Sequence, residues 1–206
     1  MLPSSPLNAM EKCNYEEADT RILMHIKDAS SKRAKNVLVR TVDTDVIVLQ
    51  VQHFHELNSL QSSLLVWVAF GMGRSFRHYS INAIRDHIGE QKSKGLPIFH
   101  AFTGCDTNSS FYGKGKKSCR AASNSLPDLT ETVLFLQDHP FQLLEKGSPQ
   151  FEILERFTIV IYDKTSSLRS VNNARRELFT KQNRMLECIS PTQVGINGFH
   201  CHRSLS

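Results

Sequence analysis

The sequence predicts an α/β fold whose second half is helical. Short β-branched runs at residues 37–39 and 64–70 predict strands, and the apolar residues at 15–29 recur at helical spacing. Beyond residue 126 the patterns are helical only. A chain of 206 residues with 40% hydrophobic residues suits one domain, or one domain with an appendage. This order of elements indicates an α/β core followed by a helical region.

The first elements alternate between helix and strand. Residues 15–29 predict a helix, because apolar side chains recur every three to four positions. Residues 37–39 predict a buried strand. Residues 46–54 are apolar enough for either a second strand or a buried helix, and we favour a helix that Thr44 or Asp43 would cap. The strand therefore ends next to a helix start that carries acidic residues.

A hairpin and two helices follow. Residues 64–70 predict a second strand, in which we expect Trp67 to lie in the core. The glycines at 71 and 73 predict a turn into the alternating stretch 74–79. Ser80 is expected to cap a helix that runs to residues 88–89, and residues 93–102 predict another helix.

The second half has helical patterns around residues 127–137, 149–162 and 168–181. We expect four regions along the chain: a disordered segment at 1–13, an α/β core at 14–125, a helical region at 126–190 and an irregular tail at 191–206.

The net charge and the cysteine content limit which binding partners and which cellular compartments suit this protein. The formal net charge of +5 permits nucleic acid as a partner without requiring it. The five cysteines form no Cys-x-x-Cys pair, which favours a reducing compartment. No run of about 18 apolar residues predicts a membrane span. We therefore expect a nuclear or cytoplasmic protein with no membrane partner.

Acidic residues gather at the ends of predicted core elements. Glu17 and Asp19 stand at a helix start, Asp43 and Asp45 follow a strand, and Asp106 follows Gly104-Cys105. Carboxylates brought together repel one another unless a cation neutralises them. Oxygen ligands of this kind suit Mg²⁺ or Mn²⁺.

A structural explanation of the same acids stays open. Glu16, Glu17 and Asp19 also suit an acidic first helical turn, and Asp43 suits an N-cap. Asp106 also suits a simple turn.

A second feature is a basic, glycine-containing loop. Gly113, Lys114, Gly115, Lys116 and Lys117 follow one another, and no acidic residue occurs between Asp106 and Asp128. Glycines let a ligand approach the backbone closely, and amides at a helix start bind anions. The loop predicts a contact with the nucleic-acid backbone, with a solvated basic loop as the alternative.

Taken in order, these motifs resemble the PIN-like 5′-nuclease superfamily, the flap endonuclease and XPG group. Glu17-Ala18-Asp19 is similar to its acidic helix start, Asp43-Thr44-Asp45 to its strand end, and Gly104-Cys105-Asp106 with the loop to its helix-two-turn-helix. The phrases EEADTR, VRTVDTDVIVL and FHAFTGCDTNSSFYGKGKK also resemble a group of animal proteins of mobile-element type that carry this module.

The resemblance implies a three-layer sandwich with a mainly parallel sheet and a two-metal site. Glu17, Asp19, Asp43, Asp45 and Asp106 would ligate Mg²⁺ or Mn²⁺ and act in catalysis. Residues 113–117 would bind branched or flapped DNA through its phosphates and hold a monovalent cation. The implied function is a metal-dependent, structure-sensing DNA nuclease.

One part of the family pattern is missing from this sequence. The family supplies further aspartates and basic groups from an N-terminal strand and a helical arch, which would precede residue 14. We therefore expect a fragment, incomplete at its N-terminus, with an exposed sheet edge. The alternative function is a catalytically silent nucleic-acid or protein-binding module that retains the fold.

Overall fold

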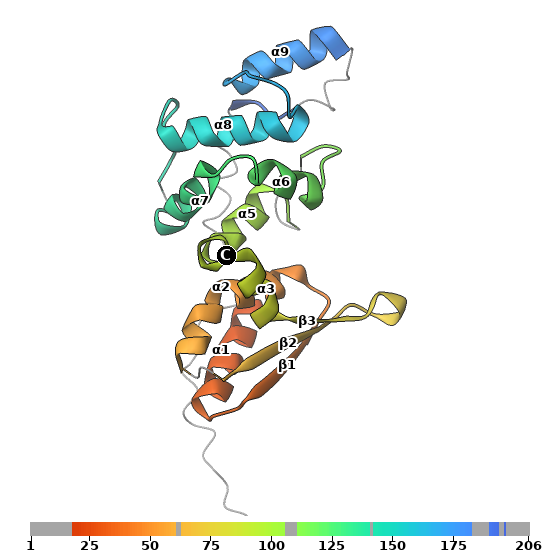
Figure 1. Cartoon of the computed structure of the whole chain (residues 1–206), viewed down its shortest axis with the longest axis vertical. Coiled ribbons are helices and arrows are strands. Elements are labelled where there is room, and N and C mark those ends of the chain that lie inside the picture. The colour runs from red at the N-terminus through yellow and green to blue at the C-terminus, as the bar shows by residue number, and fades with distance from the viewer. Residues whose placement is uncertain are drawn as a thin grey trace, which may run out of the picture. The chain divides into compact units, whose positions relative to one another are not determined.

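The computed structural model describes residues 18–60, 63–105, 111–140, 142–182, 190–193 and 196 (Figure 1). Its helices and its small sheet confirm the predicted α/β class. The chain divides into two compact units, Met1–Lys94 and Gly95–Ser206, which we call unit 1 and unit 2. Each unit is described by itself.

Unit 1 holds a mixed three-stranded sheet in the order β1-β2-β3. Strands β1 and β2 pair in parallel, and β2 and β3 pair antiparallel, so that Leu38 lies opposite Trp67 and Ala69 opposite His78. The elements confirm the predicted order of helix, strand, helix and hairpin. They are α1 (Ala18–Ser31), β1 (Asn36–Thr41), α2 (Thr44–Leu60), β2 (Leu65–Phe70), the 3-10 turn η1 (Gly73–Ser75), β3 (Arg77–Ser80), α3 (Ile81–Ile88) and α4 (Glu90–Lys94).

Helices α1, α2 and α3 pack on one face of this sheet (Figure 1). Side chains alternate between the two faces of a strand, and Val39, Val66 and Val68 are the buried ones on the helix side. They meet a helical layer whose buried residues include Ile26 and Phe54. Burying each such side chain contributes about 1.5–3 kcal/mol, so this face holds the core of unit 1.

The chain direction places two helix starts at the same end of the sheet. Helix α1 ends at Ser31 and β1 begins at Asn36, so the short connection makes helix and strand antiparallel. The first turn of α1 therefore lies at the end where β1 finishes. Helix α2 also begins there, three residues after β1 ends at Thr41.

The hairpin between β2 and β3 depends on a glycine. Gly71 has φ of 83°, and a Cβ atom there would lie 2.9 Å from the carbonyl oxygen of Ser75. An L side chain would therefore be strained at this position. After β3, the Ser80 hydroxyl accepts a hydrogen bond from the backbone N–H of Ala83, which confirms the predicted cap of α3.

Unit 2 is helical in the residues that the structure describes. Its core is built around α8, in which Phe151 and Phe157 are fully buried. Phe157 packs against the rings of Phe99 and Phe102 with centroids 6.0 Å apart in both pairs. The helices are α5 (Leu96–Phe102), α6 (Lys116–Ser123), α7 (Asp128–Asp138), α8 (Pro149–Tyr162) and α9 (Val171–Gln182).

The single helix predicted for residues 93–102 is wrong. The structure has two helices there, because α4 ends at Lys94 and α5 begins at Leu96. Gly95 stands between them, and Pro97 lies in the first turn of α5. Proline has no N–H for a helix interior but suits a helix start. Among the described residues, no helix is long and apolar enough to cross a membrane.

Candidate functional site

Asp43 joins the end of β1 to the start of α2. Its Oδ1 accepts a hydrogen bond of 2.9 Å from the backbone N–H of Asp45. Its own N–H donates to Oγ1 of Thr41 at 3.0 Å. Asp43 is thus the N-cap of α2, as the sequence predicts for either Asp43 or Thr44.

Two further carboxylates lie at the same end of the sheet. Asp19 is in the first turn of α1 and Asp45 in the first turn of α2, and both are half-buried, as is Asp43. The N-terminus of a helix carries partial positive charge, which stabilises a carboxylate in this position. The structure therefore brings Asp19, Asp43 and Asp45 to one end of the sheet of unit 1.

The chemistry of these donors fits a hard divalent cation, because all three offer carboxylate oxygens. Oδ2 of Asp43 takes no part in the cap, which uses Oδ1. Within the described ranges, no three or more His, Cys, Asp or Glu residues are grouped closely enough to hold a metal ion. The other predicted ligands, Glu17 and Asp106, lie outside the described residues, as does Glu16.

The basic loop of unit 2 leads directly into a helix. Helix α6 begins at Lys116, so two of the predicted loop residues form its first turn. The Lys116 ammonium donates to the carbonyl oxygen of His100 at 2.5 Å and to Oγ1 of Thr103 at 2.9 Å. Lys116 therefore ties α6 to the end of α5.

The neighbouring lysines differ from Lys116. The Lys114 ammonium lies 5.5 Å from the centroid of the Tyr162 ring, which is the distance of a cation–π contact. Lys117 is exposed on the first turn of α6. Cβ atoms added at Gly113 or Gly115 would meet nothing within 4 Å, so the space beside both glycines is open.

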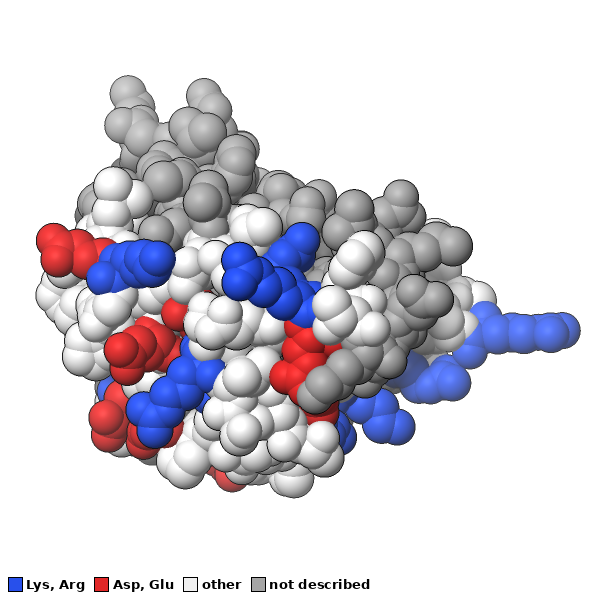
Figure 2. All heavy atoms as spheres, turned by 90° about the horizontal axis from the view of Figure 1, so that it is seen from above, with Lys and Arg blue, Asp and Glu red and all other residues white. Residues whose placement is uncertain are grey.

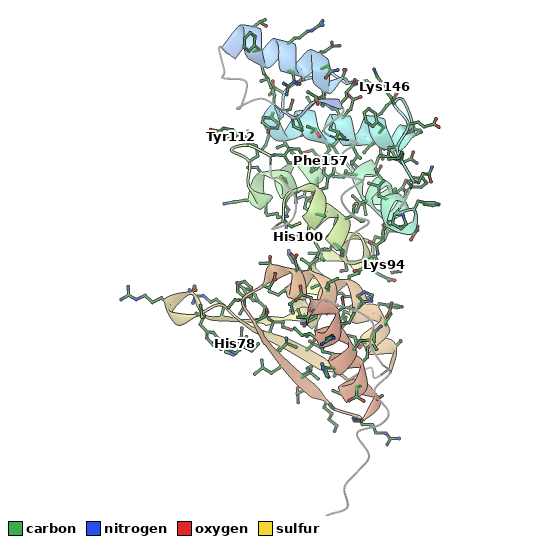
Figure 3. The ribbon with its side chains drawn as sticks, turned by 180° about the vertical axis from the view of Figure 1, so that it is seen from behind. His78, Lys94, His100, Tyr112, Lys146 and Phe157 are labelled. Carbon is green, nitrogen blue, oxygen red and sulfur yellow. The ribbon has the colours of Figure 1, made fainter. Side chains whose placement is uncertain are left out.

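Basic side chains do not gather into one continuous patch on the face that Figure 2 shows. Asp and Glu side chains lie between the Lys and Arg side chains there. At the loop, Tyr112 is 57% exposed and points away from the helices of unit 2 (Figure 3). Attraction of nucleic acid to this face would therefore depend on a few local groups.

One exposed surface in unit 1 was not predicted from the sequence. Trp67 was expected in the core, and this is wrong, because 40% of it is exposed on the sheet face opposite the helices. Leu38 beside it is 63% exposed. The run Leu64–Phe70 is apolar throughout, so hydrophobicity alone could not show which alternate residues face the helices.

Comparison of the chain with protein-family models, with curated proteins and with solved structures finds no match.

Proposed function

We propose that this chain is a Mg²⁺- or Mn²⁺-dependent nuclease domain of the PIN-like type that hydrolyses DNA phosphodiester bonds. One observation carries the proposal: one end of the sheet of unit 1 receives Asp19 from α1 and Asp43 and Asp45 from α2. The carboxyl end of adjacent parallel strands is where open α/β sheets place their active sites. The parallel β1–α2–β2 arrangement agrees with a PIN-like sandwich, of which it would form a part.

Asp19, Asp43 and Asp45 would supply three of the five ligands that the resemblance implies, and Glu17 and Asp106, which lie outside the described residues, would complete the site. Divalent cations at such sites stabilise the charge that develops on a phosphodiester when water attacks it. The contribution of the chain itself is orientation. The bond from Asp45 N–H to Oδ1 fixes the Asp43 carboxylate, so the rotamer is set before any metal arrives.

Unit 2 by itself would contribute contacts to DNA phosphates. Lys117 is exposed, and the first N–H groups of α6 lie beside the open space at Gly115. We assign the DNA backbone to this helix start and a monovalent cation to the loop at residues 113–115. Lys114 and Lys116 already have partners in unit 2 and would also hold the loop in shape.

A second candidate is a catalytically silent binding module with the same fold. One observation favours it: the N-cap bond gives Asp43 a structural role that needs no metal. The two candidate functions predict different effects for a substitution of Asp43 that preserves the N-cap of α2 and removes the negative charge.

Asp43→Asn makes that change, because Asn caps a helix about as well as Asp. The nuclease proposal expects Asp43→Asn to melt within a degree or so of the parent, to bind Mn²⁺ about 10- to 100-fold more weakly, and to lose cleavage of a 5′-flapped DNA. Asp43→Ala should lose cleavage as well and about 1 kcal/mol of unfolding free energy.

Ser80→Ala is the matched control, because it removes the cap of α3 in the same unit. It should cost about 1 kcal/mol of unfolding free energy and leave cleavage and Mn²⁺ affinity unchanged. If Asp43→Asn keeps the Mn²⁺ affinity and the activity of the parent, Asp43 is only a cap and the nuclease proposal is wrong.

A further inference from the structure

Strand β1 has one open edge among the described residues. It pairs with β2 on one side, and no other described strand pairs with its second side. Leu65 N–H donates to the Lys35 carbonyl and Gly71 N–H donates to that of Thr41, which fixes the alternate residues of β1 that bond to β2. The N–H and C=O groups of Asn36, Leu38 and Arg40 therefore point to the open edge.

The sheet face opposite the helices is also open, and it is apolar. Leu38 is 63% exposed, Leu65 45% and Trp67 40%. Leu38 and Trp67 are direct neighbours across β1 and β2, so the exposed apolar side chains form one patch. Parallel strands are normally covered on both faces, and an uncovered apolar patch of this kind is typical of a docking surface.

The charged side chain of β1 on this face is basic. Arg40 is exposed and lies two residues from Leu38, on the same face of the strand, and the strand residues 36–41, 65–70 and 77–80 contain no Asp or Glu. Arg40 lies over the ring of Phe76 at 5.1 Å, and Phe76 lies 4.9 Å from the ring of His78. His78 projects from β3 (Figure 3). A partner that matches this surface must be apolar in the middle and carry an acidic residue beside Arg40.

We propose that the open edge of β1 and the adjacent sheet face bind an extended polypeptide segment, apolar with flanking acidic residues, which adds a fourth strand to the sheet. Such strand addition gives affinity through main-chain hydrogen bonds and specificity through alternate side chains. The proposal concerns a different surface from the metal site, and it stands whether or not the chain cleaves DNA.

The register of β1 defines the partner strand. Val37 and Val39 face the helical layer, so the residues that lie opposite them should be small and apolar. Leu38 needs an apolar neighbour on the open face, and Arg40 needs an acidic one. Together these neighbours specify the pattern Glu-Val-Ile-Val-Glu, which reads the same in both chain directions, so that one Glu lies opposite Arg40 in either direction.

Two other occupants match the surface less well. A single nucleic-acid strand needs aromatic side chains to stack on its bases, whereas two of the three patch residues, Leu38 and Leu65, are aliphatic. A second copy of this chain joined through the same face would bring a second Arg40 and no Asp or Glu from the strands to the interface, and like charges across an interface oppose binding.

The test uses the full chain and the peptide acetyl-Ser-Glu-Val-Ile-Val-Glu-Ser-amide, with Lys in place of both Glu residues as the control peptide. The chain has one tryptophan, so indole fluorescence reports on the patch alone. The acidic peptide should change Trp67 fluorescence, shift the amide signals of Asn36, Leu38 and Arg40, and slow their hydrogen exchange. The basic peptide should do none of these at the same concentration.

Charge reversal then tests the specificity. Arg40→Glu should lower the affinity for the acidic peptide by roughly tenfold and make the basic peptide the better ligand. Arg120→Glu makes the same change of net charge on an exposed residue of unit 2 and should leave both affinities unaltered. Leu38→Asn should also weaken binding while β1 stays paired with β2, which the amide spectrum shows.

Three results would overturn the proposal. The first is that neither peptide affects these amides. The second is that oligo-dT shifts them and the acidic peptide does not, which would make the face a nucleic-acid platform. The third is that the signals change with protein concentration alone, which would make it a contact between copies of this chain.

Discussion

The two units of the molecule complete their cores in different ways. Unit 2 surrounds α8 with other helices, and Phe157 at its centre is 0% exposed. Unit 1 covers one face of its sheet with helices and leaves the other open, with Trp67 40% exposed. Phe157 therefore serves the stability of unit 2, whereas Trp67 on the open face of unit 1 is available for binding.

The largest effect should come from truncating one aromatic side chain in each unit. Phe157→Ala should cost about 3–5 kcal/mol of unfolding free energy, because it leaves a cavity beside Phe99 and Phe102. Trp67→Ala should cost only about 1 kcal/mol, because much of its ring is already in water. Urea unfolding followed by circular dichroism measures both. Equal losses would contradict the contrast between the units.

A buried carboxylate should matter next, and it lies in unit 2. Oε1 of Glu155 accepts hydrogen bonds from the N–H of Val171 at 3.0 Å and from Nε2 of Gln193 at 2.7 Å. Glu155→Ala leaves both donors unpaired and should cost about 1–3 kcal/mol of unfolding free energy. Glu155→Gln keeps an acceptor oxygen and should recover most of that loss in the same measurement. A Gln variant as unstable as the Ala variant would show that these bonds are not what stabilises the start of α9.

Unit 1 should gain stability from a change in its own core. Gln50 on α2 is 1% exposed, and its amide oxygen and nitrogen both lack a hydrogen-bond partner among the residues that the structure describes. Gln50→Met keeps the volume and removes the unpaired groups, so it should raise the unfolding free energy by about 1 kcal/mol. Gln137→Met in unit 2 is the control, because Gln137 is only half-buried, and its gain should be smaller. A loss of stability in Gln50→Met would contradict this account of the core.

The smallest effects should separate two adjacent lysines of unit 2. Lys116→Ala removes the bonds to His100 and Thr103 and should lower the unfolding free energy by about 0.5–1 kcal/mol. Lys117→Ala should leave the unfolding free energy unchanged. It should reduce the slope of log binding constant against log salt concentration for DNA by about one. Titrations at several salt concentrations measure the slope. An unchanged slope in Lys117→Ala would mean that this lysine is merely solvated.

The local order of elements could be predicted because it rests on short-range patterns. Helical spacing predicted α1 and α8, whereas the run that forms α2 was also compatible with a strand. Ser80 was identified as a cap from residue type and position, and Asp43 as one of two candidates for the cap of α2. The break at Gly95 was missed, since the apolar pattern runs through it. Which face of β2 stays open depends on how many helical layers cover the sheet, and that is not encoded in β2 itself.

The candidate site could likewise be predicted from the sequence only in part. The sequence identified Asp19, Asp43 and Asp45, and chain direction alone then brings them to one end of the sheet. The role of Lys116 could not be predicted, because its partners on α5 and just beyond lie 13 and 16 residues away along the chain. A lysine in a glycine-containing loop has the same sequence signature whether it binds phosphate or its own fold.

The central claim is that unit 1 binds a divalent metal at the end of its sheet where β1 finishes, and paramagnetic Mn²⁺ tests it most directly. Substoichiometric Mn²⁺ should broaden the amide signals of Asp19 and Asp45 and leave those of the open edge at Asn36 sharp. Asp43→Asn should abolish the broadening while the rest of the spectrum is preserved, since the cap remains. Sharp signals at Asp19 and Asp45 in the presence of Mn²⁺, or equal broadening in Asp43→Asn, would contradict the claim.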